Sequence, residues 1–184
     1  MRKKIILIGA STGGPSLIKE MLNEVEFLHS TIIIIQHMRE EVIPFFIKDL
    51  EESLVVDVYA TPLSTNFDKP SIIICSHSTV LQKVDDGFKL MTNTENQKYT
   101  PDINKLLHSF SNHLDEFDLS VLIMTGIGSD GINGAKVLSQ KGAKIYAQDE
   151  VSSPVYGMPK AVYESGIVDE VKSFTEIKNW IKEC

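Results

Sequence analysis

Continuous runs of β-branched residues constrain the fold of this chain more than any other feature of its sequence. Ile32-Ile33-Ile34-Ile35 is wholly apolar, and Ile5-Ile6-Leu7-Ile8 follows the same pattern. A strand of this kind has an apolar side chain on each of its faces, which is typical of parallel sheets that are covered on both sides by helices. The sequence therefore predicts a buried parallel sheet.

Helix-length amphipathic stretches separate these runs. The predicted strands are Lys4–Ile8, Thr31–Ile35, Leu54–Tyr59, Ser71–Cys75, Leu119–Met124 and Lys144–Ala147. The predicted helices are Pro15–Val25, Val42–Leu50, Pro101–His113, Gly131–Gln140 and Phe174–Lys182. This alternation predicts an α/β fold with a doubly wound, mostly parallel sheet and helices on both faces.

One region departs from the alternation. Val80–Val84 and Phe88–Thr92 flank Asp85-Asp86-Gly87, which is a pattern typical of a β-hairpin with a glycine-containing turn. We expect an antiparallel hairpin at one edge of the sheet. With 184 residues, the chain is expected to form a single domain, residues 1–184.

Charge and composition exclude several classes of protein. Eighteen Lys and Arg against 25 Asp and Glu give a net charge of −7, which argues against a nucleic-acid partner. The apolar run that follows the basic N-terminus is too short for a signal peptide, and no stretch approaches the roughly 20 apolar residues that span a bilayer. Only two cysteines, Cys75 and Cys184, are present, which suits a reducing compartment. We expect a cytoplasmic protein without membrane insertion.

Three chemically competent residues follow predicted strands. Ser11 lies within Gly9–Pro15 after the first strand, His37 follows the second, and Asp130 lies in Thr125–Gly131 after the strand Leu119–Met124. The carboxyl ends of parallel strands share one edge of the sheet, where ligands bind in doubly wound folds. Neighbouring strands are about 4.8 Å apart, so these side chains can meet.

A serine, a histidine and an aspartate in contact can carry out acyl transfer. Ser11 would be the nucleophile, His37 the base, and Asp130 the group that orients the imidazole. Backbone N–H groups at the start of the first helix, beginning with Thr12, and in the turn around Ile127 would stabilise an oxyanion. Taken singly, Ser11 and Asp130 are better explained as helix caps and His37 as a strand-end residue. Their occurrence together at three strand ends favours a site, and spacing alone leaves both interpretations open.

The same motifs resemble a known family. Gly9–Pro15, Gln36–Met38 and Thr125–Gly131 are similar to the catalytic domain of the chemotaxis receptor glutamate methylesterases (CheB). Two further segments, Tyr99–Leu107 and Gln148–Ala161, resemble that family's loop-helix after the hairpin and its late loop. The resemblance extends from about residue 4 to the C-terminus.

This resemblance implies a serine hydrolase that removes methyl groups from glutamate methyl esters on chemotaxis receptors and releases methanol. It implies that Ser11 is the nucleophile, His37 the base and Asp130 the orienting acid. Deamidation of receptor glutamines by the same acyl-enzyme route is a further implied activity. Methylated chemotaxis receptors are the implied partners, and neither a metal nor an organic cofactor is implied.

Three departures from the family pattern bear on activity. Met1 stands three residues before the first predicted strand, so we expect the catalytic domain alone, without the family's receiver domain. Ile127 replaces the methionine that is common in the Thr-Gly-x-Gly turn, and Cys75–Val80 replaces the family's Ala-Pro-Gly-Gly-x-His segment. These differences leave a second hypothesis open, a non-catalytic module that binds receptors.

A third hypothesis is an NAD(P)-dependent short-chain oxidoreductase, because Tyr156 and Lys160 match a Tyr-x-x-x-Lys pattern. Pro159 between them disfavours the shared helix that this chemistry needs. Gln36 also ends the second strand, where an acid would bind the ribose. The histidines outside the strand-end motifs match no metal-ligand spacing; they are His29, His77, His108 and His113.

Overall fold

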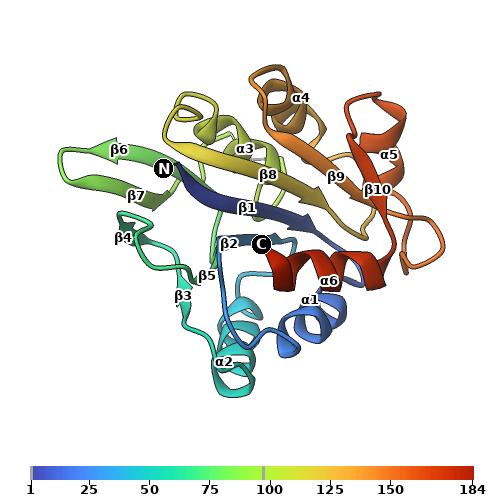
Figure 1. Ribbon diagram of the computed structural model, residues 1–184, viewed down its shortest axis with the longest axis horizontal. Helices are drawn as coiled ribbons and strands as arrows, with labels where there is room; N and C mark the ends of the chain where they lie inside the picture. Colours follow the sequence, from blue (N-terminus) through green and yellow to red (C-terminus); the bar gives the residue numbers. More distant parts are fainter. Residues whose placement is uncertain (1, 97) are drawn as a thin grey trace.

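The structure is a computed structural model that describes residues 2–96 and 98–184, and within them a central sheet of seven parallel strands. The strands run in the order β10-β9-β8-β1-β2-β5-β3 (Figure 1). Their bounds are β1 Lys3–Ala10, β2 Thr31–Gln36, β3 Val58–Ala60, β5 Ile72–Ile74, β8 Phe117–Ile123, β9 Lys144–Gln148 and β10 Glu170–Lys172. This parallel sheet confirms the predicted fold class.

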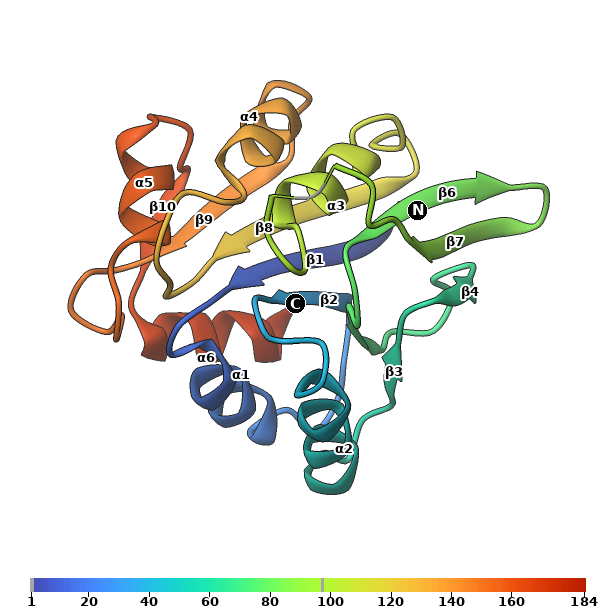
Figure 2. The same cartoon turned by 180° about the vertical axis from the view of Figure 1, so that it is seen from behind.

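Helices cover both faces of this sheet, as Figures 1 and 2 show. One face is covered by α3 (Ile103–Phe110), α4 (Ile132–Gln140) and α5 (Met158–Glu164). The other is covered by α1 (Gly14–Asn23), α2 (Ile43–Ser53) and α6 (Phe174–Glu183).

The isoleucine run of β2 packs against both helix layers. Ile33 and Ile35 belong to the core beneath α3, α4 and α5, whereas Ile32 and Ile34 belong to the core beneath α1, α2 and α6. Every residue of β2 is buried. Because successive side chains of a strand point to opposite faces, a strand between two helix layers needs apolar residues at every position.

The predicted hairpin is present as β6 (Thr79–Val84) and β7 (Gly87–Thr92). It pairs with β4 (Leu63–Thr65) in a second, antiparallel sheet of three strands within the described residues. The hairpin therefore does not extend the central sheet by hydrogen bonding. The sequence did not predict β4, because three residues are too few to show a periodic pattern.

The predicted strand Leu54–Tyr59 is wrong at its start. Helix α2 continues to Ser53, Val55 is 81% exposed, and β3 covers only Val58–Ala60. The reason is the partner strand: among the described residues β3 pairs only with β5, and β5 has three residues. The edge strand β10 was not predicted, since Glu170-Val171-Lys172 carries no apolar run.

The position of β1 determines where a ligand site can form. It lies between β8 on one side and β2 on the other, so the chain leaves β1 toward β2 and returns later on the opposite side. Such a change of direction opens a crevice at the carboxyl ends of the strands. Ser11 is the first residue after β1.

Candidate active site

A tight turn places Ser11 at the carboxyl end of the central strand. The Ser11 N–H donates to the Thr125 carbonyl at 2.9 Å, and the Ser11 carbonyl accepts from the Gly14 N–H at 2.9 Å. Gly13 has a φ of 84°, a left-handed conformation that glycine adopts without strain. This turn connects β1 directly to α1 and leaves the Ser11 side chain half-buried.

The loop after β8 approaches Ser11 closely because it contains Gly126. A Cβ atom at position 126 would lie 2.5 Å from the Ser11 Cβ and 2.6 Å from the Met158 Sδ. Both distances are far below van der Waals contact. Only glycine therefore allows this loop to pass beside the serine.

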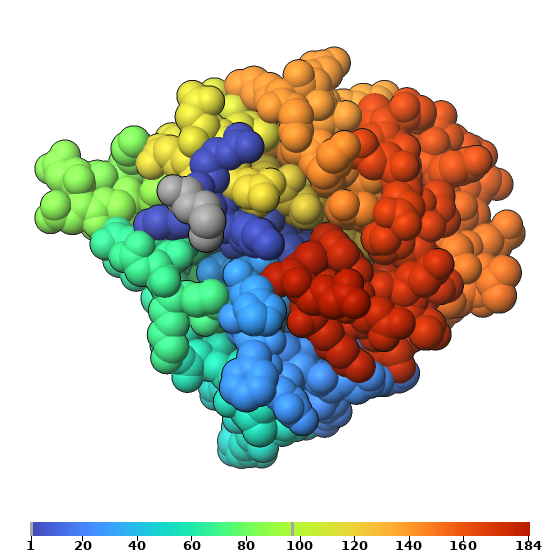
Figure 3. Space-filling view, viewed as in Figure 1, coloured from blue at the N-terminus to red at the C-terminus, as the bar shows by residue number. Residues whose placement is uncertain are grey.

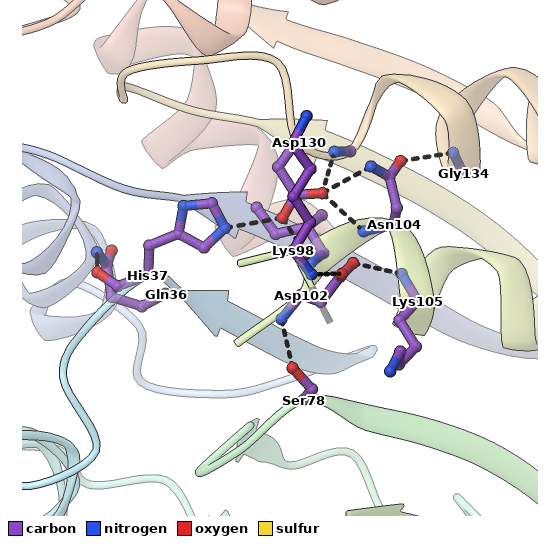
Figure 4. A network of polar contacts seen from close by, with 11 residues as sticks. Gln36, His37, Ser78, Lys98, Asp102, Asn104, Lys105, Asp130 and Gly134 are labelled. Atoms are coloured by element: carbon purple, nitrogen blue, oxygen red, sulfur yellow. Dashed lines mark hydrogen bonds and ion pairs between the residues drawn. The ribbon is translucent and has the colours of Figure 1, made fainter. Parts of the chain in front are cut away.

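His37 follows β2, and its N–H donates to the Ala10 carbonyl at 2.9 Å. The imidazole Nε2 lies 2.8 Å from Asp130 Oδ2 (Figure 4). The Tyr99 ring stacks on the imidazole, with 5.3 Å between ring centroids and 11° between the planes. These contacts hold the ring with Nε2 toward the carboxylate. Nδ1 is therefore the ring nitrogen that can accept a proton from another group.

The Asp130 carboxylate is fully buried and surrounded by donors. Oδ2 accepts from the Ile103 N–H at 2.8 Å as well as contacting His37. Oδ1 accepts from the Asn104 N–H, the Asn104 Nδ2 and the Gly131 N–H, at 3.1, 2.7 and 2.8 Å. Backbone N–H groups at the N-termini of α3 and α4 therefore orient this carboxylate, and a negative charge is favourable at such positions.

The structure brings two of the three predicted residues into contact. His37 and Asp130 are hydrogen-bonded, and Ser11 follows β1, the strand that lies between β2 and β8 in the sheet. Within the residues described, the Ser11 hydroxyl makes no hydrogen bond, so the structure shows no Ser11–His37 bond. Hydrogen bonds between catalytic groups are commonly long in the absence of substrate and shorten in the complex.

The two residues predicted to supply oxyanion donors are both exposed. Thr12 is exposed, and its carbonyl accepts from the Thr125 hydroxyl at 2.8 Å. Ile127 is 67% exposed. Neither of their N–H groups donates to another described residue.

Asn104 and Tyr99 support the site and were not identified as site residues from the sequence. The Asn104 Oδ1 accepts from the Gly134 N–H at 2.8 Å while its Nδ2 donates to Asp130, so this side chain links the starts of α3 and α4. The sequence carries no signal for this contact, because Asn104 precedes Asp130 by 26 residues.

The segment Cys75–Val80, which differs from the family pattern, is hydrogen-bonded to the start of α3. The Ser78 hydroxyl accepts from the Asp102 N–H at 2.8 Å (Figure 4). Asp102 in turn caps α3 through a hydrogen bond from the Lys105 N–H. The replacement segment is therefore connected to the helix that orients Asp130.

The oxidoreductase hypothesis fails on the position of its tyrosine. Tyr156 precedes α5, which begins at Met158, whereas Lys160 lies inside that helix and pairs with Glu164 at 3.8 Å. The two side chains do not share a helix. Among the residues that the structure describes, no cluster of three or more His, Cys, Asp or Glu side chains is arranged to hold a metal ion. No helix in the same residues has the length and apolar character needed to cross a bilayer.

Comparisons with known proteins agree with this architecture. The solved structure of the Thermotoga maritima CheB methylesterase catalytic domain has the same fold, with a TM-score of 0.83 at 23% sequence identity. The match covers 100% of this chain and 99% of that one.

Curated relatives carry a consistent description. A protein-glutamate methylesterase/protein-glutamine glutaminase of Lawsonia intracellularis is 33% identical over 181 residues, 96% of this chain and 50% of that protein. The protein-glutamate methylesterase/protein-glutamine glutaminase 1 of Saccharophagus degradans is 30% identical over 177 residues, 95% of this chain and 48% of that protein. The chain thus spans about half the length of these relatives.

The family model described as CheB methylesterase matches residues 6–181, which is nearly the whole chain. The matched range includes the strand ends that carry Ser11, His37 and Asp130. The chain belongs to the CheB methylesterase family.

Proposed function

We propose that this chain hydrolyses glutamate methyl esters on chemotaxis receptors in the cytoplasm, with Ser11 as nucleophile, His37 as base and Asp130 as the orienting acid. The single observation that carries the proposal is the 2.8 Å contact between His37 Nε2 and Asp130 Oδ2, which follow the two strands on either side of β1, the strand that Ser11 follows. Family membership supports the reaction type.

The first half of the reaction forms an acyl-enzyme. With Nε2–H donated to Asp130, the Nδ1 lone pair of His37 accepts the Ser11 proton as Oγ attacks the ester carbonyl. The N–H groups of Thr12 and Ile127 stabilise the oxyanion of the tetrahedral intermediate. The intermediate collapses as His37 returns the proton to the leaving methoxide, and methanol departs.

The second half restores the enzyme. A water molecule gives a proton to His37 Nδ1 and attacks the acyl carbonyl, and as the bond from that carbon to Ser11 Oγ breaks, His37 returns the proton to Oγ. The products are a glutamate carboxylate on the receptor and free Ser11. A receptor glutamine enters the same route with ammonia as the leaving group, and the relatives named glutaminase support this second activity.

Methanol release from membranes that contain methylated receptors tests the proposal. We expect Ser11→Ala to lower the rate by several orders of magnitude, because it removes the atom that carries the acyl group. Ser16→Ala is the matched control, since Ser16 is exposed on the next helix and is expected to leave the rate unchanged. Equal turnover by wild type and Ser11→Ala would refute the proposal. Receptor binding by the wild type without methanol release would favour the non-catalytic module instead.

A further inference from the structure

Gln36, the last residue of β2, makes an unusual pair of contacts at the candidate site. Its side chain is buried, and the residue is 3% exposed. The Nε2 group donates to the Ser11 carbonyl at 2.8 Å and to the His37 carbonyl at 2.9 Å. One amide group thus joins the main chains of the proposed nucleophile and the proposed base. Figure 4 shows Gln36 directly beside His37.

These bonds begin where the sheet ends. The last β1–β2 pair in the register is Ala10 with Gln36, and the His37 N–H still reaches the Ala10 carbonyl. Beyond that point the strands diverge into their loops. The Gln36 amide takes the place of the missing ladder bonds, because it connects the residue that follows each strand.

The orientation of the amide follows from its surroundings. With two carbonyl oxygens on one side, only the NH₂ group can satisfy them, because a flipped amide would place oxygen against oxygen. The other atom of the amide, Oε1, is buried and has no hydrogen-bond partner among the described residues. Leaving a buried acceptor unpaired is unfavourable. The folded chain keeps this orientation because it allows both hydrogen bonds from Nε2.

Gly14 makes room for this arrangement. A Cβ atom at position 14 would lie 2.0 Å from Gln36 Oε1. The φ of Gly14 is not positive, so its backbone conformation does not require glycine. The space occupied by the Gln36 amide does.

We propose that Gln36 is a positioning residue that sets the separation of the Ser11 and His37 backbones, so that the hydroxyl and the imidazole meet when substrate binds. This inference rests on the proposed function. Among the described residues, the Gln36 amide hydrogen-bonds to the backbone carbonyls of Ser11 and His37 and not to the hydroxyl or the ring, so it acts through the placement of the two residues. A displacement of about 1 Å between reacting groups is enough to lower a rate by about 10²-fold.

Gln36→Met tests the proposal, because methionine has a similar length but no donor. The readouts are the rate at which a fluorophosphonate probe labels Ser11, and kcat and KM for methanol release from methylated receptor membranes. We expect the labelling rate and kcat to fall by about 10- to 10²-fold while KM stays within twofold, because the receptor-binding surface is unchanged. Gly14→Ala is the second variant: it keeps the amide but displaces it, and we expect a smaller loss in the same two quantities.

Ser30→Ala is the matched control for stability. Ser30 is 3% exposed and donates to the Cys184 carbonyl at 2.9 Å, so its loss removes a buried hydrogen bond outside the candidate site. We expect a lower Tm with unchanged labelling.

The proposal is overturned if Gln36→Met labels at the wild-type rate, if it raises KM without lowering kcat, or if Ser30→Ala lowers labelling equally. Where Gln36→Met does not fold, an unchanged labelling rate in Gly14→Ala overturns it. Failure of the wild type to label at Ser11 would instead refute the proposed function.

Discussion

Asp130 illustrates how a single buried charge is accommodated. Its two oxygens face the N-termini of two helices, the Asn104 amide and the His37 ring, so each lone pair has a partner. A carboxylate suits this position because every neighbour is a donor. The hydrogen bond to Asp130, together with the stacked Tyr99 ring, fixes the orientation of the imidazole.

Asp130→Asn keeps the size of the side chain but places an NH₂ group against at least one N–H donor. We expect a loss of about 1–3 kcal/mol in the free energy of unfolding. We also expect kcat to fall by about 10⁴-fold, since the imidazole loses its orienting acceptor. Methanol release and thermal unfolding measure the two effects, with Asp118→Asn as the exposed control. A kcat within tenfold of the wild type would argue against an orienting role.

At the scale of elements, α6 connects the end of the chain to its beginning. Lys178 and Lys182 of α6 both pair with Glu24, the residue that follows α1, and Lys178 also pairs with Glu20. In the space-filling view, the red C-terminal helix lies directly against the blue surface of the N-terminal third (Figure 3). Glu20, Glu24 and Lys182 are exposed and Lys178 is half-buried, and ion pairs near the surface contribute little to stability at neutral pH.

Hydrogen bonds from Lys178 and Lys182 lower the pKa of Glu24 from 4.5 to about 2. Between these values the unfolded chain binds this proton more readily than the folded chain, so the stabilisation is complete above pH 4.5 and is lost as the pH falls through about 2. We expect Glu24→Gln to make Tm less dependent on pH in this window. Thermal unfolding across the window measures it, and Glu26→Gln, an exposed change nearby, serves as control. If the Tm of Glu24→Gln depends on pH as strongly as the Tm of the wild type, the ion pairs of Glu24 do not contribute to the pH dependence of stability.

At the scale of the whole molecule, the sequence predicted the elements that have the most apolar residues. β1, β2 and β8 were located to within two residues at each end, because uninterrupted apolar runs allow no other burial. The three-residue strands β4 and β10 were missed, since their pairing depends on neighbours that arrive from distant parts of the chain.

In the candidate site, too, some features could be predicted from the sequence and others could not. The strand-end positions of Ser11, His37 and Asp130 follow from topology, because a parallel sheet collects its carboxyl ends at one edge. Their catalytic roles remain a prediction. The support from Asn104 and Gln36 could not be anticipated, since it depends on side-chain conformations and on contacts that span 25 or more residues.

Activation of Ser11 by His37 and Asp130 is tested by mass spectrometry after brief exposure to a fluorophosphonate probe. We expect one adduct per wild-type chain, located on the peptide that contains Ser11, with Ser16 and Ser129 unmodified. We also expect His37→Ala to abolish this adduct. Equal modification of several serines, or labelling of Ser11 that persists without His37, would show that the three residues do not act together.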